Sequence, residues 1–276
     1  MDKYFAGKTV WIVGASSGIG EALALAFAGR GASLILSSRR ENELQRVKKN
    51  CEAFGVSCLV LPFDVADPEA IAGACRSLLE GGKKPVDILV LNSGISQRAL
   101  ALDTSIDVDR RIMEVNYFGL IDIAKQVAGY MLTRGNVRDR KHGSARGHIV
   151  VTSSLSGAFG MPYRSAYSAS KHALRGFFES LRAEYGKHGL KVTIVMPGSI
   201  RTNISRSALL GDGTAYGQMD ERLARGIPPE KAARKILKAV RKGKKEVVVA
   251  GFEGLLLFIR RYLPPLFYPI VEKVKD

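Results

Sequence analysis

Short apolar runs alternate with longer amphipathic stretches along almost all of this 276-residue chain. The apolar runs are typical of buried strands, and the stretches between them have helical spacing. The pattern predicts strands at 9–13, 33–36, 58–61, 88–91, 148–151, 192–195 and 246–249, and helices at 21–30, 41–54, 68–79, 107–132, 166–188 and 229–241. Apolar strands that alternate with helices form a parallel sheet covered on both faces, because right-handed crossovers place helices on either side. The sequence therefore predicts one doubly wound α/β domain.

The charge balance is strongly basic, with 42 Lys and Arg against 26 Asp and Glu and a formal charge of +16. Such an excess suits nucleic acid, an anionic membrane surface or a phosphate-bearing ligand. The most concentrated basic segment, 134–147, lacks aromatic residues for base stacking, so no nucleic-acid partner is expected. We interpret it as an exposed loop at the amino edge of the sheet, away from the ligand side.

Cysteine usage and the N-terminal segment bear on location and metal binding. Cys51, Cys58 and Cys75 are odd in number and lack C-x-x-C spacing, which predicts a reducing compartment and no metal site. The N-terminal segment has no uncharged stretch typical of a signal peptide. A cytoplasmic location is therefore expected.

A glycine-rich turn joins the first strand to the first helix. It reads Gly14-Ala-Ser-Ser-Gly18-Ile-Gly20. A tight turn, backbone amides close to a pyrophosphate and close packing of helix on strand all exclude side chains, and a helix N-terminus favours negative charge. A turn without a ligand is the plainer alternative, but the strand before it and the helix after it favour a dinucleotide site of the Rossmann type. The candidate residues are Gly14, Ser16, Ser17, Gly18, Ile19 and Gly20.

The second strand ends in Ser37, Ser38, Arg39 and Arg40, where dinucleotide folds contact the adenosine ribose. An acid there would bind the ribose hydroxyls and repel a 2′-phosphate, whereas arginines and hydroxyls attract it. Ser38, Arg39 and Arg40 therefore favour NADP(H) over NAD(H). The alternative is that the two arginines only open an exposed helix.

Tyr167 and Lys171 stand four residues apart in a predicted helix, so their side chains share one face. An ammonium beside a phenol would lower its pKa and make it a proton donor or acceptor for a carbonyl or alcohol. Tyr4 and Lys8 have the same spacing but precede the first strand. Tyr167 follows a buried strand and a loop of hydroxyls, 152–157, which places it at the carboxyl edge of the sheet.

These residues, taken with further elements in the same order, resemble the short-chain dehydrogenase/reductase family over about residues 6–250. The elements are Gly14-x-x-x-Gly18-x-Gly20, Asp64-Val65, Asn92-Ser93-Gly94, Asn116, Ser154, Tyr167-x-x-x-Lys171 and Pro197-Gly198-x-x-x-Thr202. Departures at Val13, Leu91 and Ser93 remove no catalytic group. Within the family, segments 108–119, 164–167, 171–173 and 181–184 resemble the dehydrogenase/reductase member 7 branch, 7B-like proteins included, and its 11β-hydroxysteroid-dehydrogenase-like relatives.

The resemblance implies roles for particular residues. Tyr167 would be the acid/base and Lys171 would bind the nicotinamide ribose, while Ser154, chosen over Ser153 by spacing, would orient the carbonyl. Asn116 would hold a water in the proton relay. The cofactor set adds Asp64 and Val65 at the adenine, Asn92, Ser93 and Gly94 at the strand end, and Pro197, Gly198, Ile200 and Thr202 at the carboxamide and phosphates. The resemblance also implies a homodimer or homotetramer formed through the helices that carry Asn116 and Tyr167.

Two segments interrupt the alternation on the ligand side and at the C-terminus. Residues 203–227 are rich in Gly and polar residues and follow a strand, which predicts a lid over the site. Residues 251–276 form an apolar extension divided by Arg260 and Arg261, and its prolines prevent one continuous helix. It is too interrupted to span a bilayer. It either lies in a membrane interface or packs over the pocket or a partner subunit.

The sequence thus predicts one Rossmann-type domain, 1–250, followed by the extension 251–276. The leading hypothesis is an NADP(H)-dependent oxidoreductase that moves hydride between nicotinamide and an apolar ketone, aldehyde or secondary alcohol. The resemblance to the member 7 branch implies that this substrate is lipid- or steroid-like. The alternative is a non-catalytic NADP(H)-binding sensor or a membrane-surface binding protein that uses the same fold.

Overall fold

The computed structural model describes residues 4–79, 85–133 and 146–274. Its centre is a parallel sheet in the order β3-β2-β1-β4-β5-β6-β7. The strands are β1 (Thr9–Val13), β2 (Ser33–Ser37), β3 (Cys58–Val60), β4 (Ile88–Leu91), β5 (Gly147–Thr152), β6 (Leu190–Pro197) and β7 (Glu246–Val249). The order reverses direction between β1 and β4, which confirms the doubly wound prediction and creates a ligand-binding crevice at the carboxyl ends.

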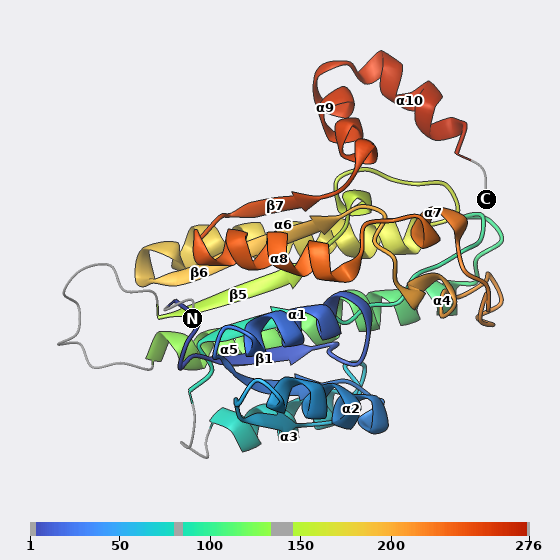
Figure 1. The fold of residues 1–276 in the computed structure, drawn as a ribbon. Helices are drawn as coiled ribbons and strands as arrows, with labels where there is room; N and C mark the ends of the chain where they lie inside the picture. The colour runs from blue at the N-terminus through green and yellow to red at the C-terminus, as the bar shows by residue number, and fades with distance from the viewer. Residues whose placement is uncertain (1–3, 80–84, 134–145, 275–276) are drawn as a thin grey trace.

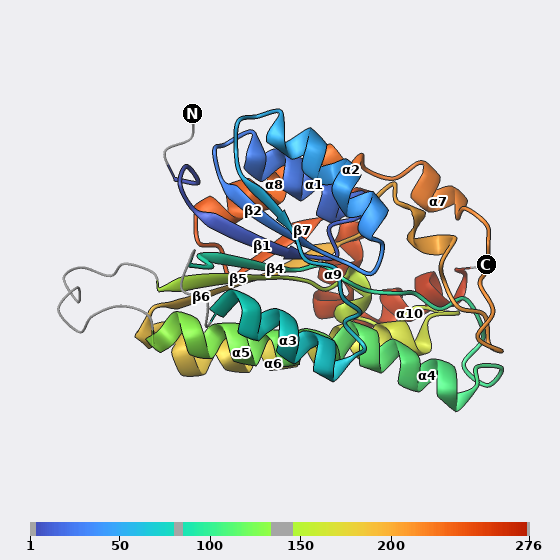
Figure 2. The ribbon, with the colours of Figure 1, turned by 90° about the horizontal axis from the view of Figure 1, so that it is seen from below.

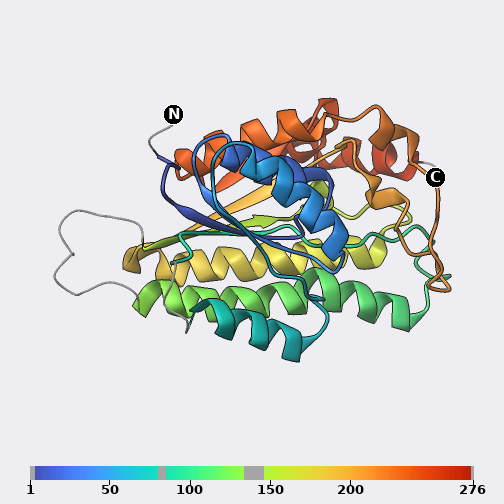
Figure 3. The same cartoon turned by 60° about the horizontal axis from the view of Figure 1, so that its bottom comes forward.

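Helices cover both faces of the sheet (Figures 2 and 3). One layer contains α1 (Gly18–Ala28), α2 (Glu41–Glu52) and α8 (Pro229–Arg241). The other contains α3 (Pro68–Leu79), α4 (Ile106–Met113), α5 (Gly119–Thr133) and α6 (Ser165–Tyr185). Shorter elements are η3 (Leu155–Gly157), η4 (Gly186–His188), η5 (Asn203–Ser205) and α7 (Glu221–Ala224).

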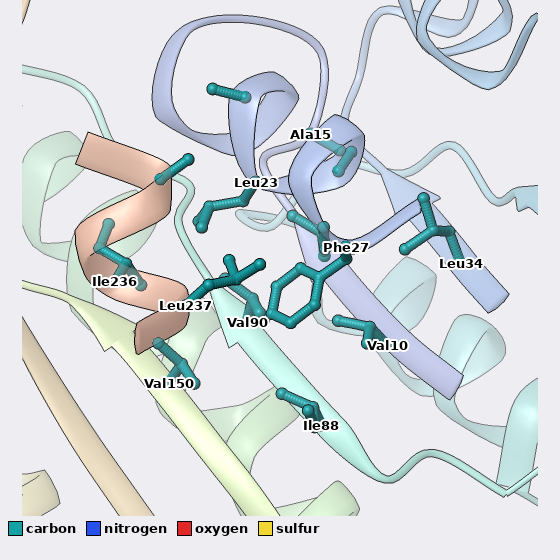
Figure 4. Close-up of a cluster of buried hydrophobic side chains, with 14 of the residues drawn as sticks. Val10, Ala15, Leu23, Phe27, Leu34, Ile88, Val90, Val150, Ile236 and Leu237 are labelled. Atoms are coloured by element: carbon teal, nitrogen blue, oxygen red, sulfur yellow. The ribbon is translucent and has the colours of Figure 1, made fainter. Parts of the chain in front are cut away.

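The apolar core lies on both sides of the sheet because every residue of β1 is buried. Val10 and Ile12 face the α1 and α8 layer, where Phe27 and Leu237 meet them (Figure 4). Trp11 belongs to the cluster on the opposite face. This double burial explains why the strands appear in the sequence as continuous apolar runs without alternation.

The predicted helical stretch 107–132 is confirmed, but a π-helical turn, η1 (Glu114–Phe118), lies between α4 and α5. The wider turn directs the buried Asn116 inward, where its side chain bonds to the backbone of Ile95. Such bulges recur at functional sites. Hydrophobic periodicity cannot reveal the turn, since it inserts only one extra residue into a continuous helical pattern.

The C-terminal extension folds as η6 (Phe252–Gly254), α9 (Leu255–Tyr262) and α10 (Pro264–Glu272). Figure 1 shows α9 and α10 outside the layered body, beyond the carboxyl end of β7. Phe267 and Val271 pack against Leu155 and Phe159 near the site, so the inner face of the extension covers protein. Within the described ranges, no helix is both long and apolar enough to cross a bilayer. Most of the predicted basic loop, 134–145, lies outside the described residues.

Candidate active site

A cavity of about 1190 Å³ opens at the carboxyl ends of the strands, on the side where the lid segment 203–227 and α4 lie (Figure 1). All of the predicted site residues line it except Gly20 and Asn116, which lie behind the wall. The cavity therefore brings the predicted cofactor and catalytic groups together in one space.

Close backbone packing explains the glycine turn at the entrance to α1. Gly14 has a φ of +91°, and a Cβ there would lie 2.5 Å from the nitrogen of Ser93. A Cβ on Gly20 would lie 1.9 Å from the carbonyl oxygen of Gly14. The turn accepts no side chain at either position, and it leaves the N-terminus of α1 open to an anionic group.

Asn92 connects the glycine turn to the neighbouring strand. Its Nδ2 donates to the carbonyl of Gly14 at 3.1 Å, and its Oδ1 accepts from the hydroxyl of Thr152 at 3.0 Å. One side chain thus fixes the ends of β1, β4 and β5 relative to one another.

The adenosine end of the cavity is rich in guanidinium groups. Arg40 donates through Nη2 to the hydroxyls of Ser16 and Ser17, each at 3.0 Å. Asp64 lies 3.9 Å from Nη1 of Arg39 and 3.5 Å from Nη2 of Arg111. Arg111 comes from α4 and was missed by sequence reasoning, because nothing in a helical pattern shows that an exposed arginine points toward the end of β3.

Lys171 is buried beside the predicted acid/base. Its ammonium donates to the carbonyl oxygen of Thr152 at 3.0 Å and lies 5.7 Å from the ring centroid of Tyr167. Burial lowers the pKa of Lys171 to about 8. The helical spacing thus places the phenol and the ammonium on one face, as predicted.

The pKa of Tyr167 is raised rather than lowered, because burial outweighs the hydrogen bond with Ser154 and the charge of Arg164, which both act to lower it. Lys171, which the sequence suggested for that effect, is not among these causes. A phenol with a raised pKa remains protonated at neutral pH, which suits a proton donor. The two candidate serines also separate: Ser153 donates to the carbonyl of Lys171 at 3.0 Å, whereas Ser154 bonds to the phenol.

A cluster of charged residues that includes Asp220, from the predicted lid segment 203–227, was also missed. Asp220 caps α7 and bonds to Arg98 at 2.5 Å and Arg164 at 3.2 Å, and the Arg98 guanidinium lies 4.8 Å from the ring centroid of Tyr216. Arg98, Arg164 and Asp220 line the cavity. The residues of this cluster come from three segments far apart in the sequence, so no motif or residue spacing indicated that they would meet.

Residues 8–211 match the family model described as short chain dehydrogenase. The chain belongs to the short-chain dehydrogenase family. A dehydrogenase/reductase SDR family protein 7-like from Anopheles gambiae is 43% identical over 271 residues, covering 96% of this chain and 82% of the relative.

Solved short-chain dehydrogenases have the same fold. One from Burkholderia phymatum, in complex with NAD, has a TM-score of 0.79 at 22% identity and covers 93% of each chain. One from Burkholderia cenocepacia, in complex with NADP, has a TM-score of 0.77 at 22% identity and covers 98% of this chain and 99% of that one. These likenesses show that the chain has the fold of solved short-chain dehydrogenases.

Proposed function

We propose that this short-chain dehydrogenase is an NADP(H)-dependent oxidoreductase acting on an apolar ketone, aldehyde or secondary alcohol. The observation that carries the proposal is that Ser154, Tyr167 and Lys171 line the same cavity as the glycine turn. The phenol of Tyr167 bonds to the hydroxyl of Ser154, which can orient a substrate oxygen atom. Both side chains share the cavity with the glycine turn that would hold the dinucleotide.

The chain's own residues would perform the proton chemistry. Ser154 would donate to the substrate oxygen and orient it, and Tyr167 would give that oxygen its proton in the reducing direction or take it in the oxidising one. Lys171 would hold the nicotinamide ribose and replace the proton lost by the phenol. NADP(H), when bound, supplies or accepts the hydride.

The preference for the 2′-phosphorylated dinucleotide rests on Arg39 and Arg40. Both line the cavity beside Ser38, at the end of β2. Asp64 accepts a long contact from Arg39 at 3.9 Å, which a phosphate would readily replace. Arg111 adds a third guanidinium nearby.

The apolar substrate class rests on the wall beyond Tyr167. Residues with apolar side chains form it, and they come from three segments, the extension among them: Leu155, Phe159, Met161, Leu209 and Leu256. Such a wall would remove the apolar part of a lipid- or steroid-like carbonyl from water.

The central test measures NADPH oxidation with a panel of apolar ketones and aldehydes. Tyr167→Phe removes the proton donor and should lower kcat at least about 100-fold. Tyr185→Phe changes an exposed residue of the same helix and should leave kcat unchanged. Undiminished turnover in Tyr167→Phe would refute the assignment and favour the non-catalytic sensor.

The cofactor preference has its own test. Replacing Arg39 and Arg40 with alanine should raise the Kd for NADPH by about 10–100-fold, since each removes a charge-assisted contact, and should leave that for NADH nearly unchanged. An equal loss for both dinucleotides would contradict the preference.

A second candidate function is contact with an anionic membrane surface through 251–276. Eight of the fifteen exposed large hydrophobic side chains among the described residues belong to this extension: Phe252, Leu255, Phe258, Tyr262, Leu263, Leu266, Tyr268 and Ile270. Arg260 and Arg261 lie between them in the sequence, and α8, which precedes β7 and the extension along the chain, exposes Lys231, Arg234, Lys235, Lys238 and Arg241. Apolar area flanked by cations suits an anionic interface.

Co-sedimentation with vesicles tests this contact. The protein should bind phosphatidylserine-containing vesicles and not pure phosphatidylcholine, and the double substitution Phe258→Ser with Leu266→Ser should abolish binding without loss of NADPH affinity. Binding that persists in the double variant would refute the role of the extension.

We also propose that the protein forms a homodimer or homotetramer, which sedimentation velocity tests.

A further inference from the structure

Residues 198–202 follow β6 and include those expected to contact the nicotinamide end of the cofactor. They lie beyond the last residue pair of the ladder between β6 and β7. The ladder ends where Pro197 pairs with Val249, and Gly198 donates the next backbone hydrogen bond, to the carbonyl of Val249 at 3.0 Å. Beyond it, the backbone nitrogen of Ser199 donates to the carboxylate Oε1 of Glu253 at 2.8 Å. A side chain of the C-terminal extension thus continues the hydrogen bonding of the sheet.

The fit around this carboxylate is close. A Cβ on Gly198 would lie 2.4 Å from Oε1 of Glu253, and a Cβ on Gly251 would lie 3.0 Å from Oε2. Neither glycine has a positive φ, and a Cβ at either position would press on the Glu253 carboxylate. Gly198, which the family resemblance connects with the cofactor, therefore also makes room for Glu253.

The extension contacts the opposite side of the cavity as well. Phe267 packs on Phe159 with their ring centroids 5.2 Å apart, just after the segment that carries Ser154. Glu253 and Leu256 line the cavity together with Ser199 and Ile200. The extension thus connects the cofactor loop to the wall of the substrate pocket.

We infer that Glu253 is a positioning residue, through which the C-terminal extension holds the backbone of 198–202 in the conformation that binds the nicotinamide end of the cofactor. The inference rests on the proposed function, because it assumes that a nicotinamide dinucleotide occupies this cavity. The hydrogen-bond acceptor at Oε1 is the essential group, and the negative charge is not.

The test compares Glu253→Ala with Glu253→Gln, which keeps a side-chain acceptor of the same length. NADPH binding is measured at equilibrium by the fluorescence of the bound nucleotide, without turnover. Glu253→Ala should raise the Kd for NADPH and for NADP⁺ by about 5–10-fold, the equivalent of one lost hydrogen bond, and Glu253→Gln should stay within about twofold of the wild type. Glu272→Ala removes an exposed carboxylate from the same extension and should leave both constants unchanged.

The possible results distinguish a failure of the proposed function from a failure of the positioning role of Glu253. If the wild type binds neither nucleotide, the proposed function fails. If it binds both and Glu253→Ala binds equally well, the positioning role is overturned, whatever happens to the Tm. Equal losses in Glu253→Ala and Glu253→Gln would overturn it too, because they would assign the effect to charge and not to the hydrogen bond.

Discussion

The side chain of Asn116 bonds to both backbone groups of a single residue, Ile95. Its Oδ1 accepts from the nitrogen of Ile95 at 2.8 Å, and its Nδ2 donates to the carbonyl oxygen at 2.9 Å. Nδ2 also donates to the hydroxyl of Ser170 on the helix of Tyr167 and Lys171. Both polar groups of the side chain are thus engaged with protein, and Asn116 fixes the end of β4 to the catalytic helix.

Asn116→Leu should therefore damage both stability and activity. A leucine of similar size leaves the backbone groups of Ile95 without their partner, which costs about 2–4 kcal/mol of unfolding free energy. We expect kcat to fall at least about 10-fold, because the helix that carries Tyr167 and Lys171 loses its hydrogen bond from Asn116 at Ser170. Urea unfolding and NADPH oxidation measure the two effects. Gln126→Leu, which removes only a local bond to Asp122 on α5, is the control and should change little.

Lys171 imposes a stability cost that depends on pH. Burial lowers its pKa to about 8 in the folded protein, against about 10.4 in an unfolded chain. Between these values the unfolded chain binds more protons, so stability should rise with pH from 8 to about 10.4, and below pH 8 the full cost remains. A shift of this size corresponds to about 3 kcal/mol.

Lys171→Met should remove that cost along with the function. At pH 7 the variant should be more stable than the wild type, and the rise in stability above pH 8 should disappear, while kcat falls sharply. Thermal unfolding from pH 6 to 10 measures this. A methionine variant that keeps the rise would show that another group causes it.

The sequence predicted the parts of the molecule whose causes are local. Buried strands such as β1 and β4 appear as apolar runs, and the helix that carries Tyr167 and Lys171 fixes their relative placement. The contacts that could not be predicted from the sequence join segments that lie far apart in the chain. Glu253 meets Ser199, and Asp220 meets Arg98 and Arg164, only because the chain returns to the same edge of the sheet. The raised pKa of Tyr167 was missed for a similar reason, since burial is a property of the assembled cavity.

If segment 203–227 acts as the predicted lid, Asp220 should hold it against the body of the protein through Arg98 and Arg164. Burial acts to raise its pKa, but the hydrogen bond and charge of Arg98 prevail and hold the pKa below its usual value. Its stabilising contribution is therefore present above pH about 4 and is lost as the pH falls through the lowered pKa.

Asp220→Asn should lower the unfolding free energy by about 3–5 kcal/mol, because it leaves two guanidinium groups without this buried carboxylate. The KM for the carbonyl substrate should rise more than kcat falls. Glu221→Gln, the next residue, breaks an exposed pair with Arg225 and should cost less than about 1 kcal/mol. Similar losses in the two variants would mean that the buried cluster does not hold the lid.

Gly119, at the start of α5, tests the packing of this helix against the loop after β3. A Cβ there would lie 1.7 Å from the carbonyl oxygen of Val65, a backbone atom that cannot rotate away. Gly119→Ala should therefore destabilise the protein by about 2–3 kcal/mol, at the upper end of the cost of overpacking. It should also weaken NADPH binding, because Val65 lines the end of the cavity where the adenine is expected.

Gly176→Ala is the matched control, since a Cβ on this exposed residue of α6 meets nothing within 4 Å. It should stabilise the protein by about 0.5–1 kcal/mol through helix propensity alone. If both substitutions stabilise the protein in urea unfolding, α5 does not lie against Val65 as described.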